Sequence, residues 1–153
     1  MRPYITQFST SYLNDVVSGD ICVAAGWSGD ATIIQQRMAE AGLPDEIVYL
    51  TPRGETALWF TMMGVPKDAQ NKDTAYQWIN HLLSKEMAAS TTNALTYTTA
   101  VPGARELVKP ELRASAVIFP AADDVKTFFA LQPLEPKVNK TVNKLWLRFK
   151  AEG

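Results

Sequence analysis

The sequence predicts an α/β protein, and more specifically one part of a larger α/β assembly. Segments with helical periodicity alternate with short apolar runs of strand length, which is the pattern of α/β folds. The 153 residues are 46% hydrophobic and 20% charged, as in a globular domain with a core of its own. Only about three segments have clear strand character, whereas a complete doubly wound domain of this length would show more.

The first predicted helix covers residues 9–19 and leads into the first predicted strand at residues 21–25. Ser9 and Thr10 can cap the start of the helix, apolar side chains recur within it at helical spacing, and Gly19 can end it. The strand reads ICVAA, an uninterrupted apolar run of strand length.

A second helix is predicted over residues 28–42, and two further strands follow it at residues 47–52 and 57–66. The helix can end at Gly42, which is followed by a leucine and a proline. Both strand candidates are apolar runs that stop at a proline, which cannot donate to a strand ladder.

Two helices are predicted in succession after residue 70, with Asn71 able to cap the first and Ser84 the second. Prolines break the chain into short pieces beyond Tyr97, and a last helix is predicted over residues 136–150. The first helix of the pair carries an apolar stripe at i, i+3, i+4 and i+7, formed by Ala75, Trp78, Ile79 and Leu82. We expect the aromatic residues on such stripes to lie in the core: Trp78, Trp146 and Phe149.

Charge and motif content argue against several classes of function. The formal net charge of -1 implies no broad basic face, so nucleic acid is not an expected partner. His81 is the only histidine, and no motif for nucleophilic, metal-dependent or phosphate-binding catalysis is present, so we expect neither an enzyme nor a metal site. Cys22, the only cysteine, is expected to be a buried structural thiol.

Aromatic and acidic residues at the ends of predicted elements form a candidate site. Trp27 and Asp30 lie in the stretch GWSGD, while Trp59 and Tyr97 lie in later segments. An aromatic face attracts an ammonium group with roughly 0.5–2 kcal/mol, and a carboxylate adds a charge-assisted hydrogen bond. The same residues can instead be structural, with Trp27 in the core and Asp30 as a helix cap. The residue types therefore leave a cation pocket and a plain turn both open.

Longer motifs resemble the C-terminal part of the periplasmic polyamine-binding proteins, the spermidine/putrescine receptors of ABC importers. The two most specific are SYLNDVVSGDICVAAGWSGD and MMGVPKDAQNKDTAYQWINHLL. Further matching stretches are YLTPRGETALWF, NALTYTTAVPGARELV, IFPAADDVKTFFAL and the final WLRFK. They follow in the right order and cover nearly the whole chain.

This resemblance implies a partial periplasmic-binding-protein type II fold, the C-terminal portion of a two-lobed receptor. Residues 1–33 would belong to the second lobe, residues 34–87 to the first lobe, and residues 88–153 to the second lobe again. Most of the first lobe and the signal peptide would lie outside the chain, which agrees with the small number of strand candidates.

The resemblance also implies which residues contact a ligand. The family binds its amine between the lobes, with aromatic walls and with carboxylates for the ammonium groups. Position by position, the family's contacts fall on Trp27, Asp30, Trp59 and Tyr97, and on Ser9 at the start of the first helix. The resemblance thus favours the cation pocket.

One departure from the family pattern bears on the choice of ligand. Polyamine binders commonly carry a second Asp two residues after the pocket aromatic, and this chain has Thr61 there. An ammonium buried without its carboxylate typically costs several kcal/mol. The expected ligand is a polyamine such as putrescine or spermidine, and the alternatives are a related amine, an ω-amino acid, or a truncated fragment that binds nothing.

The remaining implications of the resemblance concern the binding partners and the cellular location of the protein. The resemblance implies a periplasmic protein that delivers its ligand to the membrane permease of an ABC importer and needs no cofactor. The fragment would pair either with the missing N-terminal lobe or with a second copy of itself.

Overall fold

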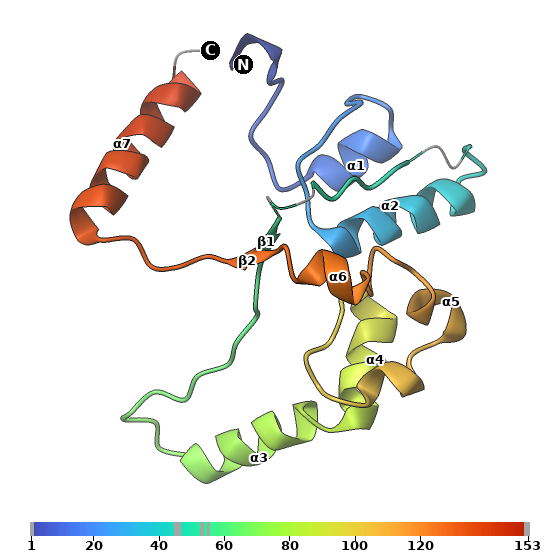
Figure 1. Cartoon of the computed structure of the whole chain (residues 1–153), viewed down its shortest axis with the longest axis vertical. Helices are drawn as coiled ribbons and strands as arrows, with labels where there is room; N and C mark the ends of the chain where they lie inside the picture. Colours follow the sequence, from blue (N-terminus) through green and yellow to red (C-terminus); the bar gives the residue numbers. More distant parts are fainter. Residues whose placement is uncertain (1, 45–46, 53, 55, 152–153) are drawn as a thin grey trace.

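The computed structural model describes residues 2–44, 47–52, 54 and 56–151, and it shows helices joined by long extended segments (Figure 1). In chain order the elements are the 3-10 helix η1 (Arg2–Tyr4), α1 (Tyr12–Val17), α2 (Ser28–Glu40), β1 (Ala57–Leu58), α3 (Lys72–Leu82), α4 (Lys85–Leu95), the 3-10 helix η2 (Ala104–Leu107), α5 (Pro110–Arg113), α6 (Ala122–Val125), β2 (Phe129–Ala130) and α7 (Pro136–Ala151).

The predicted helices are confirmed, but α1 begins only at Tyr12, with Ser11 rather than Ser9 or Thr10 as its N-cap residue. Gly19 and Gly42 follow α1 and α2 and have positive φ angles of 81° and 65°, the conformation that ends helices and favours glycine. Ser84 caps α4, since its hydroxyl oxygen accepts a hydrogen bond of 3.3 Å from the backbone N–H of Met87. Asn71 is the N-cap residue of α3, but its side chain makes no capping hydrogen bond.

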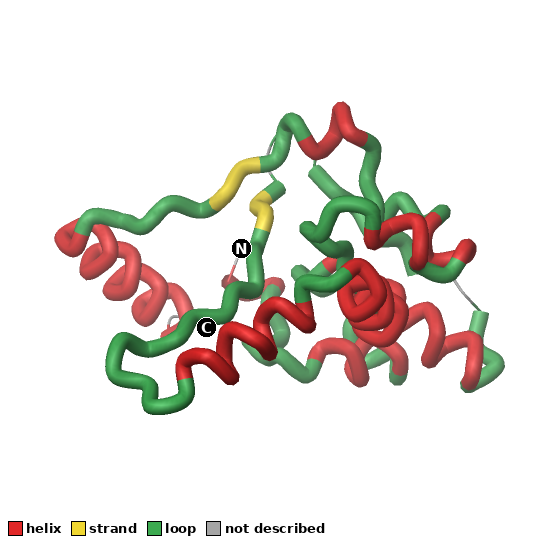
Figure 2. Tube along the Cα trace, turned by 90° about the horizontal axis from the view of Figure 1, so that it is seen from below, coloured by secondary structure: helices red, strands yellow, loops and turns green. Residues whose placement is uncertain are grey.

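The predicted strands are mostly wrong. Residues 21–25 and 47–52 form no strand, and only Ala57–Leu58 of the predicted 57–66 strand is β structure. An extended apolar segment becomes a strand only when a neighbour completes its hydrogen-bond ladder. Here β1 pairs in parallel with β2, and these are the two strands of the described residues (Figure 2).

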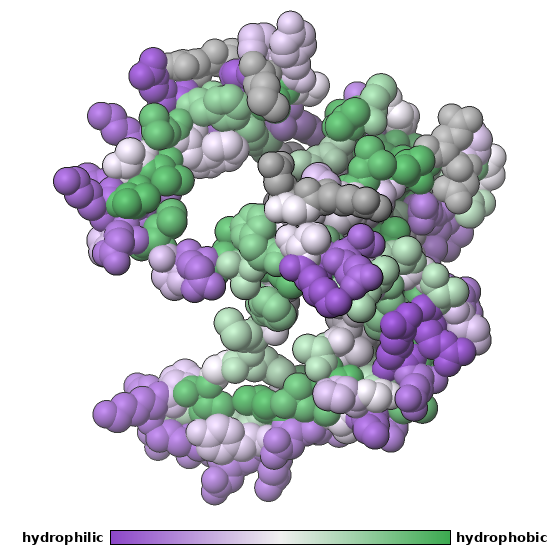
Figure 3. Space-filling model, viewed as in Figure 1, coloured by the Kyte–Doolittle hydropathy of each residue, from purple (hydrophilic) through white to green (hydrophobic). Residues whose placement is uncertain are grey.

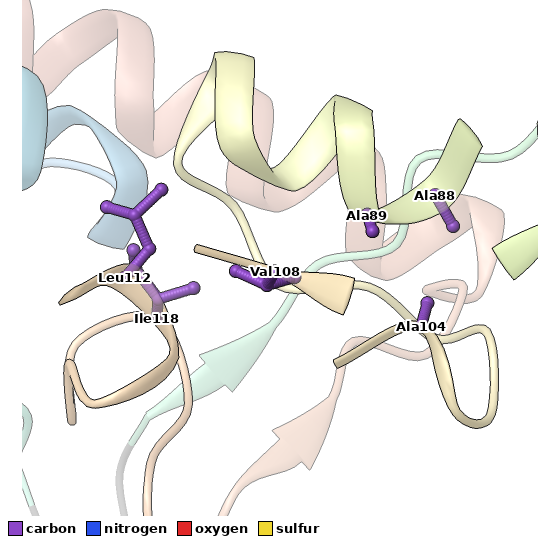
Figure 4. Packing of buried hydrophobic residues seen from close by; sticks show 6 residues of the cluster. All are labelled: Ala88, Ala89, Ala104, Val108, Leu112 and Ile118. Atoms are coloured by element: carbon purple, nitrogen blue, oxygen red, sulfur yellow. The ribbon is translucent and has the colours of Figure 1, made fainter. Parts of the chain in front are cut away.

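The hydrophobic core lies around α4. Small side chains of α4 pack against η2, α5 and the segment after α5, which lets these short elements approach the helix closely (Figure 4). The buried cluster consists of Ala88, Ala89, Ala104, Val108, Leu112 and Ile118. This packing holds α4 in place, and the chain continues from the end of α4 toward the start of α2.

Several residues expected in the core are exposed. Trp78 and Trp146 are 58% and 46% exposed, Phe149 is half-buried, and the Cys22 thiol is exposed as well. The stripe of α3 lies open along a cavity of about 250 Å³, and apolar residues gather on the inner sides of the molecule (Figure 3). The predicted apolar stripes of α3 and α7 are present, but no element among the described residues covers these faces fully.

Candidate functional site

The carboxylate of Asp30 is the centre of the candidate site. Asp30 lies in the first turn of α2, where the positive end of the helix dipole favours an acidic side chain. Its Oδ1 accepts a hydrogen bond of 2.7 Å from the hydroxyl of Tyr97, and its Oδ2 accepts one from the hydroxyl of Tyr12. The helix itself has Trp27 as its N-cap residue without a capping side-chain bond, so Asp30 is not the cap that the structural reading of the sequence allowed.

Tyr12 adds a second link within the site. It is the first residue of α1, and its hydroxyl accepts a hydrogen bond of 3.1 Å from the backbone N–H of Trp27 while donating to Asp30. One hydroxyl therefore connects three parts of the chain: the start of α1, the loop before α2 and the first turn of α2.

The position of Tyr97 is set by the residue before it. Thr96 ends α4 in the left-handed conformation, with a φ angle of 59°, which is unusual for a β-branched residue. Its buried hydroxyl donates a hydrogen bond of 2.9 Å to the carbonyl oxygen of Gly29. This bond joins the end of α4 to the start of α2 and directs Tyr97 toward Asp30.

Two glycines make room for the two tyrosine rings. A Cβ atom added at Gly26 would lie 2.5 Å from the hydroxyl oxygen of Tyr12. A Cβ atom added at Gly29 would lie 2.5 Å from Cε2 of Tyr97. Both distances are well below carbon contact distance, so the glycines of GWSGD are needed for the close approach of the rings rather than for backbone freedom.

Both tyrosines stay protonated far above neutral pH. Partial burial is the main cause and the hydrogen bond to Asp30 the next, and together they raise the pKa of Tyr12 to about 12. The pKa of Tyr97 is also raised, for the same two reasons in the same order. At neutral pH the two hydroxyls are therefore donors, which suits a carboxylate that can only accept.

Trp27 and Trp59 form the aromatic part of the site. Their ring centroids are 5.1 Å apart and the rings are perpendicular, an edge-to-face pair. The two side chains are 45% and 63% exposed, so Trp27 lies at the surface and not in a closed core. The exposed parts of both rings are open to solvent, and a cation within about 6 Å of a ring centroid would be attracted to it.

Four of the sequence-predicted residues thus form one connected set. Trp27 contacts Trp59 through its ring and Asp30 through the hydroxyl of Tyr12, while Tyr97 bonds to Asp30 directly. Among the hydrogen bonds, ion pairs and ring contacts of the described residues, none joins Ser9 or Thr61 to this set. Ser9 accepts a hydrogen bond of 3.0 Å from the backbone N–H of Ser11 before α1, and Thr61 is exposed two residues after Trp59.

Sequence reasoning missed Tyr12 as a member of the site. Its place in the first predicted helix gave it the role of one apolar stripe residue among several. The available signal was Gly26, because glycine that is not needed for a turn indicates the close approach of another group.

The chemistry of the set suits a cation. A carboxylate has about four lone-pair positions, and the two tyrosine bonds leave room for a further donor. The half-buried Asp30 is held in place by neutral donors, so its negative charge has no cationic partner within the set. An ammonium group beside Asp30 would find a charge-assisted acceptor and the Trp27–Trp59 pair nearby.

Comparison with known proteins finds similar sequences over nearly the whole chain. Residues 1–136 match the family model for bacterial extracellular solute-binding proteins. The chain is similar to a putrescine-binding periplasmic protein of Escherichia coli, with 35% identity over 99% of this chain and 41% of the relative. It is similar to a putrescine/agmatine-binding protein of Pseudomonas aeruginosa, with 32% identity over the same shares of the two chains.

A solved structure shows the same fold. The chain superimposes on the spermidine/putrescine ABC transporter substrate-binding protein of Streptococcus pneumoniae with a TM-score of 0.74 and 24% identity. The match covers 92% of this chain and 42% of that protein. This likeness confirms the prediction of a partial periplasmic-binding-protein fold, and the chain spans about two fifths of the length of the proteins that it matches.

Proposed function

Because the chain belongs to the bacterial extracellular solute-binding protein family, we propose that it is part of a receptor for a polyamine such as putrescine or spermidine. The receptor would act in the periplasm and pass its ligand to the membrane permease of an ABC importer, without catalysis and without a cofactor. Several relatives are named as periplasmic putrescine- or spermidine-binding proteins, which supports this assignment. Among the described residues, no helix is both long and apolar enough to cross a membrane.

The observation that carries the proposal is the environment of Asp30. Its carboxylate accepts hydrogen bonds from two neutral tyrosine hydroxyls, and the exposed Trp27–Trp59 pair lies within the same set of contacts. Carboxylates that are removed from water are usually paired with a cation, whereas the half-buried Asp30 has only neutral donors within this set. Here the missing positive charge is the feature that an amine ligand supplies.

The division into lobes is part of the proposal. Residues 1–33 and 88–153 would form parts of the second lobe, and residues 34–87 a part of the first. Trp27 and Asp30 then belong to one lobe and Trp59 to the other, so the two indole rings meet across the boundary. A ligand between the lobes would touch both, which is how a small molecule comes to be mostly buried.

The rest of such a cleft needs further protein. The chain spans 41% of its Escherichia coli relative, and the apolar faces of α3 and α7 are exposed. We propose that the remainder of a full-length receptor, including most of the first lobe, covers these faces, and that the chain alone associates with a second copy instead. An isolated chain would then bind amines weakly, because water screens both the cation–π contact and the carboxylate contact.

Thr61 supports a second candidate ligand. A hydroxyl gives an ammonium only a neutral hydrogen bond, whereas the Asp common at this position in polyamine binders gives a charge-assisted one. A ligand with one ammonium and one carboxylate, such as an ω-amino acid, would avoid this loss.

The test is calorimetric titration of the protein expressed from its complete gene with putrescine, spermidine and 4-aminobutyrate. Binding of a diamine, weakened by Trp27→Ala and unchanged by Tyr76→Phe at an exposed position of α3, is the expected result. Preference for 4-aminobutyrate would support the second candidate. Binding of none of the three ligands would contradict the proposed function.

A further inference from the structure

The hydroxyl of Tyr12 makes two hydrogen bonds within the candidate site, although Tyr12 is not one of the proposed ligand contacts. It donates to Oδ2 of Asp30 and accepts from the backbone N–H of Trp27 at 3.1 Å. These two bonds link the carboxylate of Asp30, which would bind an ammonium group, to the backbone of Trp27, whose indole ring would pack against the same group. The tyrosine ring reaches this point from α1, a separate helix.

The local sequence is adapted to this hydroxyl. Any side chain at position 26 would place its Cβ 2.5 Å from the Tyr12 oxygen and 2.7 Å from the two ring carbons Cε2 and Cζ. Gly26 has no left-handed backbone angle that would require glycine for conformational reasons, since the positive-φ glycines lie elsewhere. The close approach of Tyr12 is therefore the structural reason for glycine at this position.

We propose that Tyr12 is a positioning residue, whose hydroxyl fixes the Asp30 carboxylate and the Trp27 backbone relative to each other so that both meet one ammonium group. This inference rests on the proposed amine-binding function. The single hydroxyl proton of Tyr12 is committed to Asp30 and one of its acceptor positions to the backbone N–H of Trp27, so these contacts connect it to the site through Asp30. Without it, Asp30 would keep only the bond from Tyr97, and its carboxylate could turn about that single contact.

The first arm of the test needs no ligand. Gly26→Ala should displace the Tyr12 hydroxyl, which would expose it to water and break its bond to Asp30, and these are the two main causes that raise its pKa to about 12 from the ordinary value of 10.0. NMR of ring-labelled tyrosine at a pH of about 11, midway between the two values, should find Tyr12 protonated in the wild type and largely ionised in Gly26→Ala. Gly64→Ala is the matched control, because a Cβ added at Gly64 meets nothing within 4 Å. Identical Tyr12 ionisation in the wild type and in Gly26→Ala would overturn the proposal.

The second arm measures putrescine affinity in a double-mutant cycle of Tyr12→Phe and Asp30→Asn. Because the freed Asp30 side chain would have to be ordered again when the ligand binds, Tyr12→Phe alone should weaken binding by about three- to tenfold. In the Asp30→Asn background the same change should cost less than about twofold, because the group through which Tyr12 acts is already altered. Tyr76→Phe on α3, an exposed tyrosine outside the site, should leave the affinity unchanged.

The outcomes separate a positioning role from a structural one. Equal losses on Tyr12→Phe in both backgrounds would mean that Tyr12 supports the fold rather than Asp30, and would overturn the proposal. Circular dichroism of each variant shows whether a loss reflects unfolding, and Gly26→Ala gives a second route to the same displacement if Tyr12→Phe does not fold. Absence of putrescine binding in the wild type would contradict the proposed function itself, while the NMR arm would still decide whether Tyr12 holds Asp30.

Discussion

Replacing Gly29 with alanine tests the packing that joins α2 to the end of α4. The new Cβ would lie 2.5, 2.6 and 2.7 Å from three ring carbons of Tyr97, whereas carbon atoms in contact lie about 3.5–4.0 Å apart. The backbone cannot easily move away, because the carbonyl oxygen of Gly29 is held by the buried hydroxyl of Thr96 at 2.9 Å. The Tyr97 ring must therefore shift by roughly 1 Å, which carries its hydroxyl out of hydrogen-bond range of Asp30.

The size of the effect follows from three contributions. Overpacking costs about 1–3 kcal/mol, and a lost hydrogen bond to a partly exposed carboxylate about 1 kcal/mol more. Alanine in place of glycine in a helix returns at most about 1 kcal/mol. Gly29→Ala should thus lower the free energy of unfolding by about 1–3 kcal/mol, with Gly64→Ala as the control in open space.

Urea unfolding followed by tryptophan fluorescence measures this difference. A chain in which Gly29→Ala is as stable as the wild type, or more stable, would show that Tyr97 does not pack on Gly29. The connection between α4 and α2 would then be wrong, and with it the placement of Tyr97 beside Asp30.

Three further predictions concern pH, ligand charge and association. The folded chain keeps the protons of Tyr12 and Tyr97 above the pH of about 10 at which the unfolded chain releases them. The free energy of unfolding should therefore keep its full value below that pH and decrease as the pH rises toward about 12. Urea midpoints measured across this range should fall less in the Tyr12→Phe/Tyr97→Phe variant than in the wild type. Thr61→Asp should strengthen putrescine binding by about tenfold and weaken 4-aminobutyrate binding, as measured by calorimetry. An unchanged ranking of the two ligands would show that the charge of the side chain at position 61 does not affect ligand choice. The isolated chain should self-associate through the apolar faces of α3 and α7, so light scattering that finds a monodisperse monomer with micromolar amine affinity would contradict the proposed missing lobe.

The parts of the fold that the sequence predicts are those with local causes. Ser84 caps α4 through a neighbour three residues away, and Gly19 ends α1 by its own backbone angle, so both features can be read from a short window. The strands depend on distant partners. Ala57 pairs with Phe129, which no local pattern indicates, and residues 21–25 have every local property of a strand without a neighbour to pair with.

Burial was predicted less well for a related reason. Amphipathic spacing identifies the face of a helix that can be covered, but not whether an element covers it. Trp78 and Trp146 lie on such faces and remain about half exposed, and Cys22 is exposed in a segment that pairs with neither strand of the described residues. The exposed stripes are thus consistent with a chain that spans 41% of its relative.

The candidate site combines both kinds of information. The resemblance to polyamine-binding proteins singled out Trp27, Asp30, Trp59 and Tyr97, which the structure brings into one set of contacts, while their role in ligand binding stays a prediction. Tyr12 needed the structure, because the hydroxyl that links Asp30 to Trp27 comes from another helix and leaves only an indirect trace in the sequence, the glycine at position 26.

The central claim is that Asp30 binds the ammonium group of a ligand. The most direct measurement is calorimetric titration of putrescine into the protein expressed from its complete gene, as the wild type, Asp30→Asn and Asp68→Asn. Asp30→Asn removes the charge but keeps the shape, and should weaken binding by at least about tenfold, while the same change at the exposed Asp68 should have no effect. Equal affinity of the wild type and Asp30→Asn for putrescine would contradict the claim.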